Sequence, residues 1–264
     1  MNLCSIASGS SGNCIYIGNA NTGILVDTGI SKKRIVDGLV SIDVNPEKLD
    51  GILITHEHSD HISGLGVFTR KYKTPIYATR ETIRCILNSN SLGALDQTLF
   101  HEIKPNESFY LQDIKVNPFS ISHDAANPVS YTFDDADGRV GVATDLGTYD
   151  EYIISNLEGC GALLLEANHD INMLQVGAYP YALKRRILSD VGHLSNDNSG
   201  RLLSRLFTDK LKYIFLGHLS KENNYPELAY ETVRCELRNS GLTKEMGNYL
   251  QVAKRDTPSE FVTI

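Results

Sequence analysis

The stretch Ile52–Gly64 reads ILITHEHSDHISG and places three histidines, a glutamate and an aspartate in the six positions after an apolar run and a threonine. On an extended segment, residues two apart point to the same side, so His56 and His58 can converge on one ion. After a turn into a following helix, Asp60 and His61 can face a second ion. Imidazoles and carboxylates are usual ligands of Zn, Mn and Fe. The stretch therefore predicts a metal-binding loop at the end of a buried strand, although Asp60 alone would also suit a helix N-terminus.

Three further candidate ligands each follow another apolar, strand-like run. His123 follows Phe119-Ser120-Ile121, Asp145 comes soon after 140–143, and His218 comes soon after 213–216. Loops at strand ends are where a rigid sheet presents functional groups, and one carboxylate can bridge two ions through its two oxygens. The candidate set is large enough for two ions with positions left for water: His56, His58, Asp60, His61, His123, Asp145 and His218.

Strand-like and helix-like segments alternate along the chain. Apolar runs at 14–17 and 23–26, separated by Gly and Asn, are typical of hairpin strands. This rhythm predicts one α/β domain over residues 1–264, with two sheets packed face to face and helices outside them. We expect helices at 31–40, 62–72, 80–88, 181–189, 198–207 and 226–239, and further strands at 51–54, 75–78, 109–111, 114–121, 129–133, 139–143, 162–165, 211–216, 251–253 and 261–263.

Composition narrows the class of protein. With 264 residues, 41% hydrophobic and 22% charged, the chain suits an ordinary globular protein with a substantial core. Its five scattered cysteines include no CxxC, which argues against a disulfide framework or a zinc ribbon. The N-terminus does not resemble a signal peptide, and no apolar run has membrane-spanning length, so we expect a cytoplasmic protein with no membrane partner.

The net charge of −7 disfavours a broad nucleic-acid-binding surface. It still allows a local basic patch, and a bound metal pair would itself attract an anionic substrate.

The HxHxDH motif at 56–61, followed by a lone histidine, an aspartate after a strand and a last histidine, resembles the metallo-β-lactamase fold superfamily. The match runs from Ser8 to His218. It implies a four-layer αββα sandwich, with two mixed sheets flanked by helices, and two divalent metal ions, Zn or Mn with Fe possible. It implies one ion on His56, His58 and His123, a second on Asp60, His61 and His218, and Asp145 bridging them.

Other motifs narrow the branch. The sequence GHLS occurs at 192–195 and again at 217–220, similar to paired signatures of transfer-RNA 3′-processing nucleases. That resemblance implies that His193 lies by the scissile phosphate as an acid or an anchor, not as a ligand. The segments 8–13, 165–170, 192–196 and 218–224 look like those of the YycJ/WalJ group, which implies 5′-to-3′ exonuclease activity on DNA. The chain is too short for the added β-CASP domain of some related nucleases, and no substrate-gripping arm is visible.

The function predicted from these features is a dinuclear metal-dependent hydrolase of phosphodiesters, with a water between the ions as nucleophile. DNA is favoured over RNA as the substrate, and Asp60 and His193 are the predicted catalytic residues. Two alternatives stay open: a hydrolase of a small ester, thioester or phosphodiester, and a non-catalytic metal-binding regulatory protein.

Four residues are candidate substrate contacts, each with a plainer interpretation beside the functional one. The plainer interpretations are a Gly-rich turn, a core histidine and a solvated helical face. The residues are Asn13, His169, Lys184 and Arg185.

Overall fold

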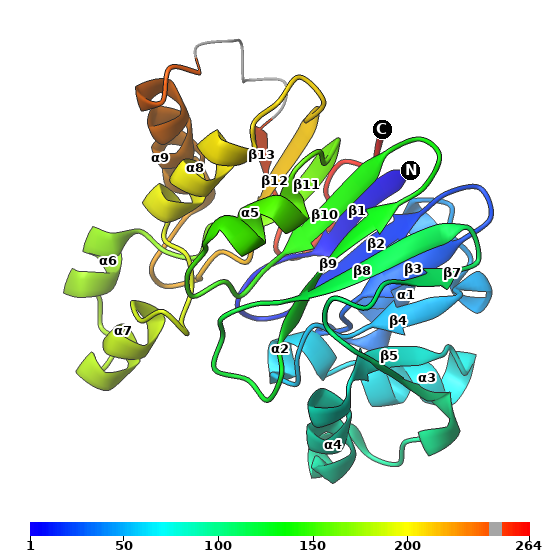
Figure 1. The fold of residues 1–264 in the computed structure, drawn as a ribbon. Helices are drawn as coiled ribbons and strands as arrows, with labels where there is room; N and C mark the ends of the chain where they lie inside the picture. The colour runs from blue at the N-terminus through cyan, green and yellow to red at the C-terminus, as the bar shows by residue number, and fades with distance from the viewer. Residues whose placement is uncertain (243–249) are drawn as a thin grey trace.

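Two sheets packed face to face form the centre of the molecule (Figure 1). The computed structural model describes residues 1–242 and 250–264. Within these ranges each sheet has seven strands, in the orders β14-β1-β2-β3-β4-β5-β6 and β13-β12-β11-β10-β9-β8-β7. Both sheets are mixed, because antiparallel pairing on one side gives way to parallel pairing at β3–β4 and at β10–β11.

The first sheet comes mainly from the N-terminal part of the chain. Its strands are β1 (Asn2–Ala7), β2 (Cys14–Gly18), β3 (Gly23–Val26), β4 (Gly51–Leu53), β5 (Ile76–Thr79), β6 (Phe100–Ile103) and β14 (Val262–Thr263). The second sheet consists of β7 (Phe109–Leu111), β8 (Ile114–Ser120), β9 (Val129–Asp134), β10 (Arg139–Ala143), β11 (Ala162–Glu166), β12 (Tyr213–Gly217) and β13 (Leu250–Val252).

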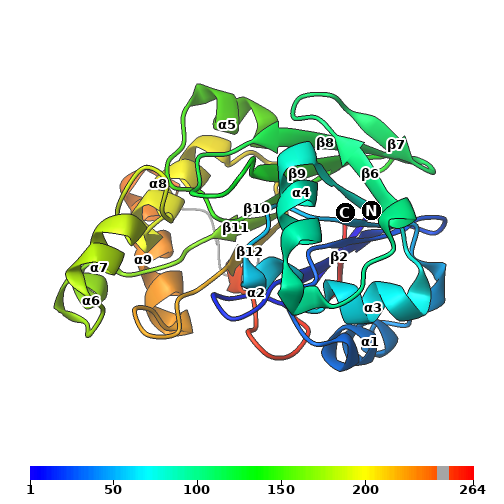
Figure 2. The ribbon, with the colours of Figure 1, turned by 90° about the horizontal axis from the view of Figure 1, so that it is seen from below.

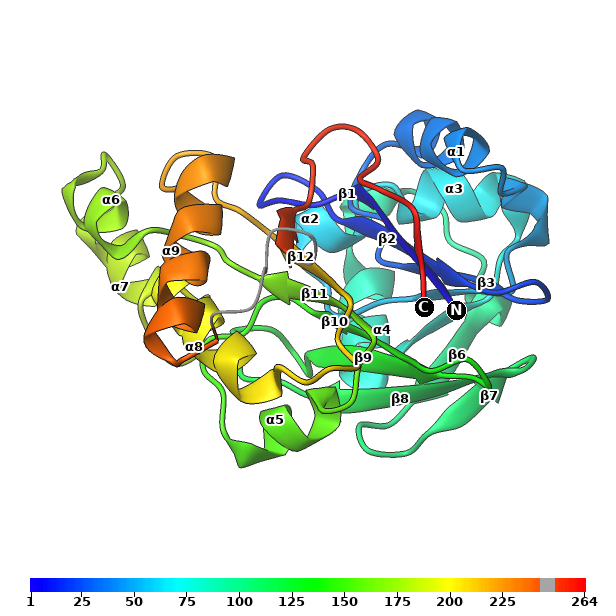
Figure 3. The ribbon, with the colours of Figure 1, turned by 90° about the horizontal axis from the view of Figure 1, so that it is seen from above.

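Helices cover the outer faces of both sheets, and Figure 3 shows the sheets lying between α1 and α3 on one side and α5 and α8 on the other. Figure 2 shows the same arrangement from below, with α6 and α7 at one end of the molecule. The helices are α1 (Lys32–Ser41), α2 (Ser59–Ile62), α3 (Leu65–Tyr72), α4 (Arg80–Asn88), α5 (Glu151–Leu157), α6 (Ile171–Val176), α7 (Tyr181–Ile187), α8 (Asn196–Leu206) and α9 (Pro226–Asn239), with short 3₁₀ turns at Pro46–Lys48, Asn90–Leu92 and Gln97–Leu99.

Three buried apolar clusters match the three interfaces between these four layers. Leu53, Tyr131 and Phe215 belong to the cluster between the sheets. A second cluster, which includes Phe68, joins the first sheet to its helices, and a third, which includes Leu203, joins the second sheet to its helices. The αββα sandwich expected from the sequence is confirmed.

Local sequence explains where the helices begin and end. Ser31 caps α1 by accepting a hydrogen bond from Arg34 N, and Pro226 opens α9, where its missing N–H costs nothing. The helix expected at 62–72 is divided, because α2 ends at Ile62 and α3 starts at Leu65. The N–H of Gly64, between them, donates to Thr28 O at 2.8 Å instead of continuing a helix.

In the described ranges, no helix is both long enough and apolar enough to cross a membrane.

Candidate metal centre

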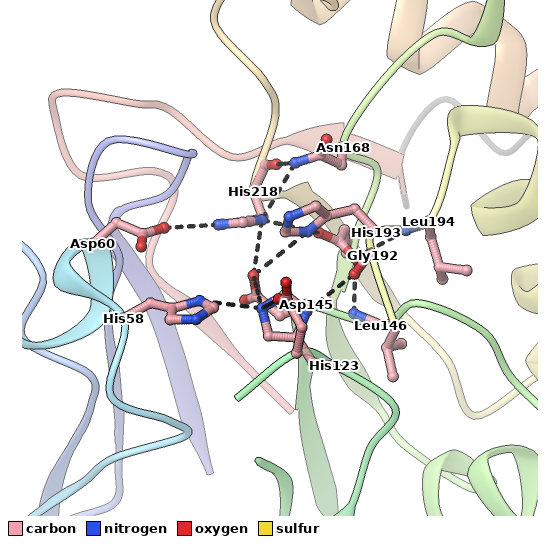
Figure 4. Close-up of polar contacts among 12 residues, drawn as sticks. His58, Asp60, His123, Asp145, Leu146, Asn168, Gly192, His193, Leu194 and His218 are labelled. Carbon is pink, nitrogen blue, oxygen red and sulfur yellow. Dashed lines mark hydrogen bonds and ion pairs between the residues drawn. The ribbon is translucent and has the colours of Figure 1, made fainter. Parts of the chain in front are cut away.

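The seven candidate ligands meet at one edge of the sandwich, in loops that follow β4, β8, β10 and β12. His56 and His58 follow β4, and α2 begins directly after them and carries Asp60 and His61. The second sheet presents His123, Asp145 and His218 after three different strands. Figure 4 shows side chains from both sheets turned toward one another. Residues far apart in the chain therefore share one centre.

Ligand atoms at this centre group in threes at distances that suit a metal ion. In each of two groups, one nitrogen or oxygen per side chain lies within 4.8 Å of the others. The groups are His56 with His58 and His123, and Asp60 with His61 and His218. They are the two sets that the family resemblance implies. Asp145 forms a third group with His56 and His61, which places it beside both sets.

Two buried polar atoms at this centre have no hydrogen-bond partner in the described part of the chain. They are His56 Nε2 and Asp145 Oδ2. His61 Nε2 lies 3.3 Å from Asp145 Oδ2 but does not make a hydrogen bond with it. An unpaired polar atom in a protein interior costs free energy, so atoms left this way indicate an absent partner. Imidazole nitrogen and carboxylate oxygen are the donors that divalent ions take, and the residues therefore fit a divalent metal.

Three of the histidines are held by a second contact behind the ring. His61 Nδ1 lies 2.7 Å from Asp27 Oδ2, His218 Nδ1 lies 2.9 Å from Glu166 Oε1, and His123 Nδ1 lies 3.0 Å from Gly192 O. Such contacts fix the tautomer of a metal-binding histidine and orient its free nitrogen. In each ring, the contact leaves Nε2 for the centre.

Strained backbone also positions the site. Asp27, Asp145 and His218 have φ of 60°, 60° and 55°, in the left-handed region, directly after or close to the ends of β3, β10 and β12. For residues other than glycine this region is uncommon, and it persists only where the surrounding structure imposes it. The strain turns the chain sharply at the edge of the sandwich where the ligands meet.

Glu166, at the end of β11, joins several parts of the site. It is fully buried and accepts hydrogen bonds from Leu146 N and Leu194 N, at 2.8 and 3.1 Å. Its Oε1 atom lies 2.8 Å from His193 Nδ1 and 2.9 Å from His218 Nδ1. One carboxylate thus orients a candidate ligand and the histidine expected beside the scissile phosphate.

The charges at the centre are strongly coupled. Burial alone would raise the pKa of Asp60, but His61 and His218 hold it far below its usual range. Burial alone would lower the pKa of His61 and His218, but the surrounding carboxylates raise both, that of His218 to about 10. Burial and the neighbouring histidines lower the pKa of His56. Protons on His61 and His218 therefore balance the carboxylates in the metal-free protein, and a divalent ion would displace them.

The position of Asp60 is fixed by two loops that adjoin β2 and β3 of the first sheet. Asn13 N donates to Asp60 O at 2.8 Å, and Asn13 Nδ2 lies 3.2 Å from His61 Nε2. A Cβ atom on Gly29 would lie 1.6 Å from Asp60 O, so only glycine fits there. Asn13, a candidate substrate contact, is thus buried against two candidate ligands.

A cavity of about 190 Å³ opens over the centre. Part of its lining comes from the centre itself, namely His58, Asp60, Asp145, His193 and His218. Another part comes from α7 and the turn before it, namely Tyr179, Leu183, Arg186 and Ile187.

The other candidate substrate contacts lie away from this cavity. Lys184 Nζ donates to the carbonyls of Gln175 and Gly177, at 2.8 and 2.6 Å, and ties α7 to α6. Arg185 lies over the ring of Tyr181, 6.0 Å from its centroid. His169 is buried, and neither ring nitrogen has a hydrogen-bond partner within the described ranges.

Three residues that shape the site were not predicted from the sequence. They are Asp27, Thr55 and Glu166. Arg186 belongs to the basic run 184–186, in which Lys184 and Arg185 were the predicted substrate contacts, and it is the member of that run that lines the cavity. Thr55 donates through both N and Oγ1 to Asp27, at 2.9 Å each, and Arg186 forms a two-pronged ion pair with Asp124 beside His123. A signal was present for Asp27 and Glu166, because each is an acidic residue at the end of an apolar strand.

The fold and the centre define a class of protein. The chain belongs to the β-lactamase superfamily, because the family model described as "Beta-lactamase superfamily domain" matches residues 22–214. Among solved structures, Zn(2+)-bound PqqB from Methylobacterium extorquens superposes with a TM-score of 0.74 at 15% identity, covering 98% of this chain and 100% of that one. This likeness concerns the fold.

Two curated relatives are similar over most of their length. The "Exodeoxyribonuclease WalJ" of Streptococcus pneumoniae serotype 2 (strain D39 / NCTC 7466) is 43% identical over 237 residues, covering 90% of this chain and 88% of that protein. The "Exodeoxyribonuclease YycJ" of Bacillus anthracis is 39% identical over 236 residues, covering 89% of each. The resemblance stated from the motifs is confirmed.

Proposed function

We propose that this chain is a metal-dependent phosphodiesterase that degrades DNA from the 5′ end and binds two divalent ions, Zn or Mn. The observation that carries the proposal is the pairing of two three-residue ligand groups with the Glu166–His193 contact at the same cavity. The names of the two curated relatives support DNA as the substrate.

The proposed ligands are the seven residues named from the sequence, with Asp145 shared between the two groups. Two divalent ions there would act as Lewis acids and activate water at neutral pH. Asp60 holds its group together, because its Oδ2 lies 3.2 Å from His218 Nε2 and 3.3 Å from His61 Nε2. Its side chain also faces the cavity, where it would orient the attacking water.

His193 is the proposed proton donor. Its Nδ1–H donates to the buried Glu166 carboxylate, so Nε2 is the atom left to face substrate. Although burial opposes it, the contact of Glu166 with His193 and His218 holds the pKa of Glu166 far below its usual range. A carboxylate fixed in its charged form stabilises the imidazolium, which can protonate the leaving oxygen at Nε2.

Arg186 is the proposed contact to a non-bridging phosphate oxygen. It is the arginine that lines the cavity, and its side chain keeps 42% exposure although it pairs with Asp124. A planar guanidinium can bind carboxylate and phosphate on different edges. Asp124 would then hold Arg186 in place for the substrate.

The test is cleavage of end-labelled duplex DNA, single-stranded DNA and RNA, with added Mn or Zn, by wild type, Asp60→Ala and His193→Ala. We expect stepwise loss from the 5′ end of DNA, abolished by Asp60→Ala and weakened by about 100-fold or more by His193→Ala, the usual contribution of a general acid. Metal content, measured on each preparation, separates loss of an ion from loss of chemistry.

Two outcomes would contradict the proposal. Metal-loaded wild type that leaves every polymer intact but hydrolyses a small ester or thioester would assign the centre to small substrates. Metal-loaded protein with no turnover of either kind would indicate a regulatory role.

A further inference from the structure

A second cavity, of about 510 Å³, lies next to the metal centre at the ends of β12 and β13. Its walls come from the loop between β12 and α9 and from the segment that follows β13. We use six of its residues below: Leu219, Lys221, Tyr225, Val252, Lys254 and Arg255.

This cavity, called here the side cavity, adjoins the cavity over the metals. Ser220 lines both. Ser8 lines the side cavity and Ser10 the metal cavity, so the loop that carries them separates the two spaces. Arg255 fixes this loop by donating to Ser11 Oγ at 3.3 Å and to Leu219 O at 2.6 Å. Because the two cavities share Ser220 in their walls, neighbouring nucleotides of one strand could reach both of them across this loop.

The side cavity is cationic in a protein of net charge −7. Lys221 and Lys254 are exposed, and their ammonium groups have no hydrogen-bond or ion-pair partner among the described residues. Among the described residues of the lining, Asp256 is the one carboxylate, and it is paired with Arg34 at 3.1 Å. Two unpaired ammonium groups beside a phosphodiesterase centre suit a phosphate.

The start of α9 adds to this field. Tyr225 and Pro226 line the side cavity, and the side chain of Tyr225, the N-cap residue, makes no capping hydrogen bond to this helix of 14 residues. Uncapped N–H groups at a helix start attract anions. Glu227, in the first turn, is not part of the lining.

The remaining wall is apolar and suits a base. Leu219 and Val252 line the floor, and Tyr225 is 48% exposed. Aromatic side chains stack on bases of any sequence. A cavity with an aromatic side chain, an apolar floor and a cationic rim has the chemistry of a nucleotide site.

We propose that the side cavity binds one nucleotide of the DNA strand next to the bond that is cut. The base stacks on Tyr225, and its phosphate lies between Lys221, Lys254 and the start of α9. The proposal rests on the proposed function, because it assigns a subsite to the same substrate. The phosphate is either the 5′-terminal one or one farther along the strand.

The test compares Lys221→Glu/Lys254→Glu with Lys48→Glu/Lys71→Glu, two exposed lysines outside both cavities that change the net charge equally. KM and kcat are measured on DNA with 5′-phosphate and 5′-hydroxyl ends. We expect the first pair to raise KM about 10- to 100-fold and the control pair to change it less than about 3-fold. Loss of a preference for the phosphorylated end would assign the site to the terminal phosphate, and an equal rise on both ends would assign it to an internal one.

Tyr225→Ala tests the base separately. It should raise KM about 5-fold or more, and Tyr225→Phe, which keeps the ring, should restore the wild-type value. Equal KM for the Lys221/Lys254 pair and its control, at normal metal content, would overturn the proposal.

Failure of the proposed function can be distinguished from failure of the proposed nucleotide site in the side cavity. Wild type that cuts no DNA contradicts the exonuclease assignment. Anisotropy of fluorescent DNA with the same variants then still decides the side cavity, because equal affinity of wild type and Lys221→Glu/Lys254→Glu would reject it.

Discussion

The two sheets build the metal centre in different ways. The first sheet supplies four of the seven candidate ligands from one six-residue stretch after β4. The second sheet supplies three, one after each of β8, β10 and β12. Each three-residue group that holds the proposed ions takes side chains from both sheets. The ligands from the first sheet therefore form a local motif that needs only the end of one strand. The ligands from the second sheet come together only once that whole sheet has folded.

The largest effects should come from removing one ligand of the same group on each side. His61→Ala on the first sheet and His218→Ala on the second should each lower the DNA cleavage rate about 1000-fold and the metal content by one ion, because that ion requires both sheets. Metal analysis and cleavage kinetics on the two variants check this. Two bound ions in either variant would show that this ion does not need ligands from both sheets.

Substitution of the carboxylates that contact the histidines, Asp27 and Glu166, should distinguish the contributions of the two sheets to the centre. Asp27→Asn weakens support for His61 directly and for His56 through Thr55, whereas Glu166→Gln weakens support for His193 and His218 together. Each should weaken metal binding about 10- to 100-fold. Glu166→Gln should also lower the kcat of the metal-loaded enzyme, because His193 loses the carboxylate that orients it. Asp27→Asn should leave the kcat of the metal-loaded enzyme close to that of wild type, and an equal loss of kcat in both variants would contradict the assigned roles.

The close packing against the backbone of Asp60 can be tested with two glycine substitutions in the N-terminal part of the chain. Gly29→Ala places a methyl group against Asp60 O and should lower the free energy of unfolding by about 3 kcal/mol as well as cleavage activity. Gly23→Ala is the control, because its new Cβ would have no neighbour nearer than 3.5 Å. Denaturant unfolding of both proteins measures the difference, which should vanish if the backbone near Asp60 is adaptable.

The smallest effect concerns His169 in the second half. Burial lowers its pKa from 6.5 to about 4, so the folded protein keeps the ring neutral. Its unfolded pKa is higher, and the unfolded state therefore takes up the proton first as the pH falls. Stability should be unaffected above about pH 6.5 and should decline between pH 6.5 and 4, by about 3 kcal/mol in total.

Denaturant unfolding of the metal-free protein and of His169→Gln at several pH values isolates this contribution. The variant should lose less stability over the same range, and parallel curves would show that His169 does not titrate as described.

The difference between the halves also explains what the sequence could predict. The ligands at 56–61 can be recognised from the spacing within that one stretch. The helices α1, α4 and α9 lie at or within one residue of the expected ranges. The strands β1 and β6 and the helices α5 and α6 were not predicted. Half-exposed segments such as β6, with Phe100 and Ile103 around two exposed polar residues, carry a weak pattern.

The supporting residues of the centre were harder to predict than its ligands. Asp27 and Glu166 are single acidic residues whose partners lie 34 and 52 positions away, and only the packed sheets bring them into contact. In the run Lys184-Arg185-Arg186, the sequence favoured the first two for substrate, whereas Arg186 faces the cavity. The rotational orientation of the short helix α7, seven residues or about two turns after a proline, decides which side chain faces the cavity, and the sequence does not fix that orientation.

The order of strands in the first sheet bears on how the chain is made. The strands β1 and β14 are paired, so residues 2–3 lie beside residues 262–263. The proposed second ion likewise needs two residues distant in sequence, His61 and His218. A chain leaves the ribosome from its N-terminus, so the histidine-rich stretch is exposed long before its partners exist. Contacts this distant in sequence form slowly, because a long loop must close first. Nascent chains therefore carry an incomplete centre until His218 has been added and the second sheet has formed, and hydrolytic activity at this centre has to wait for that step.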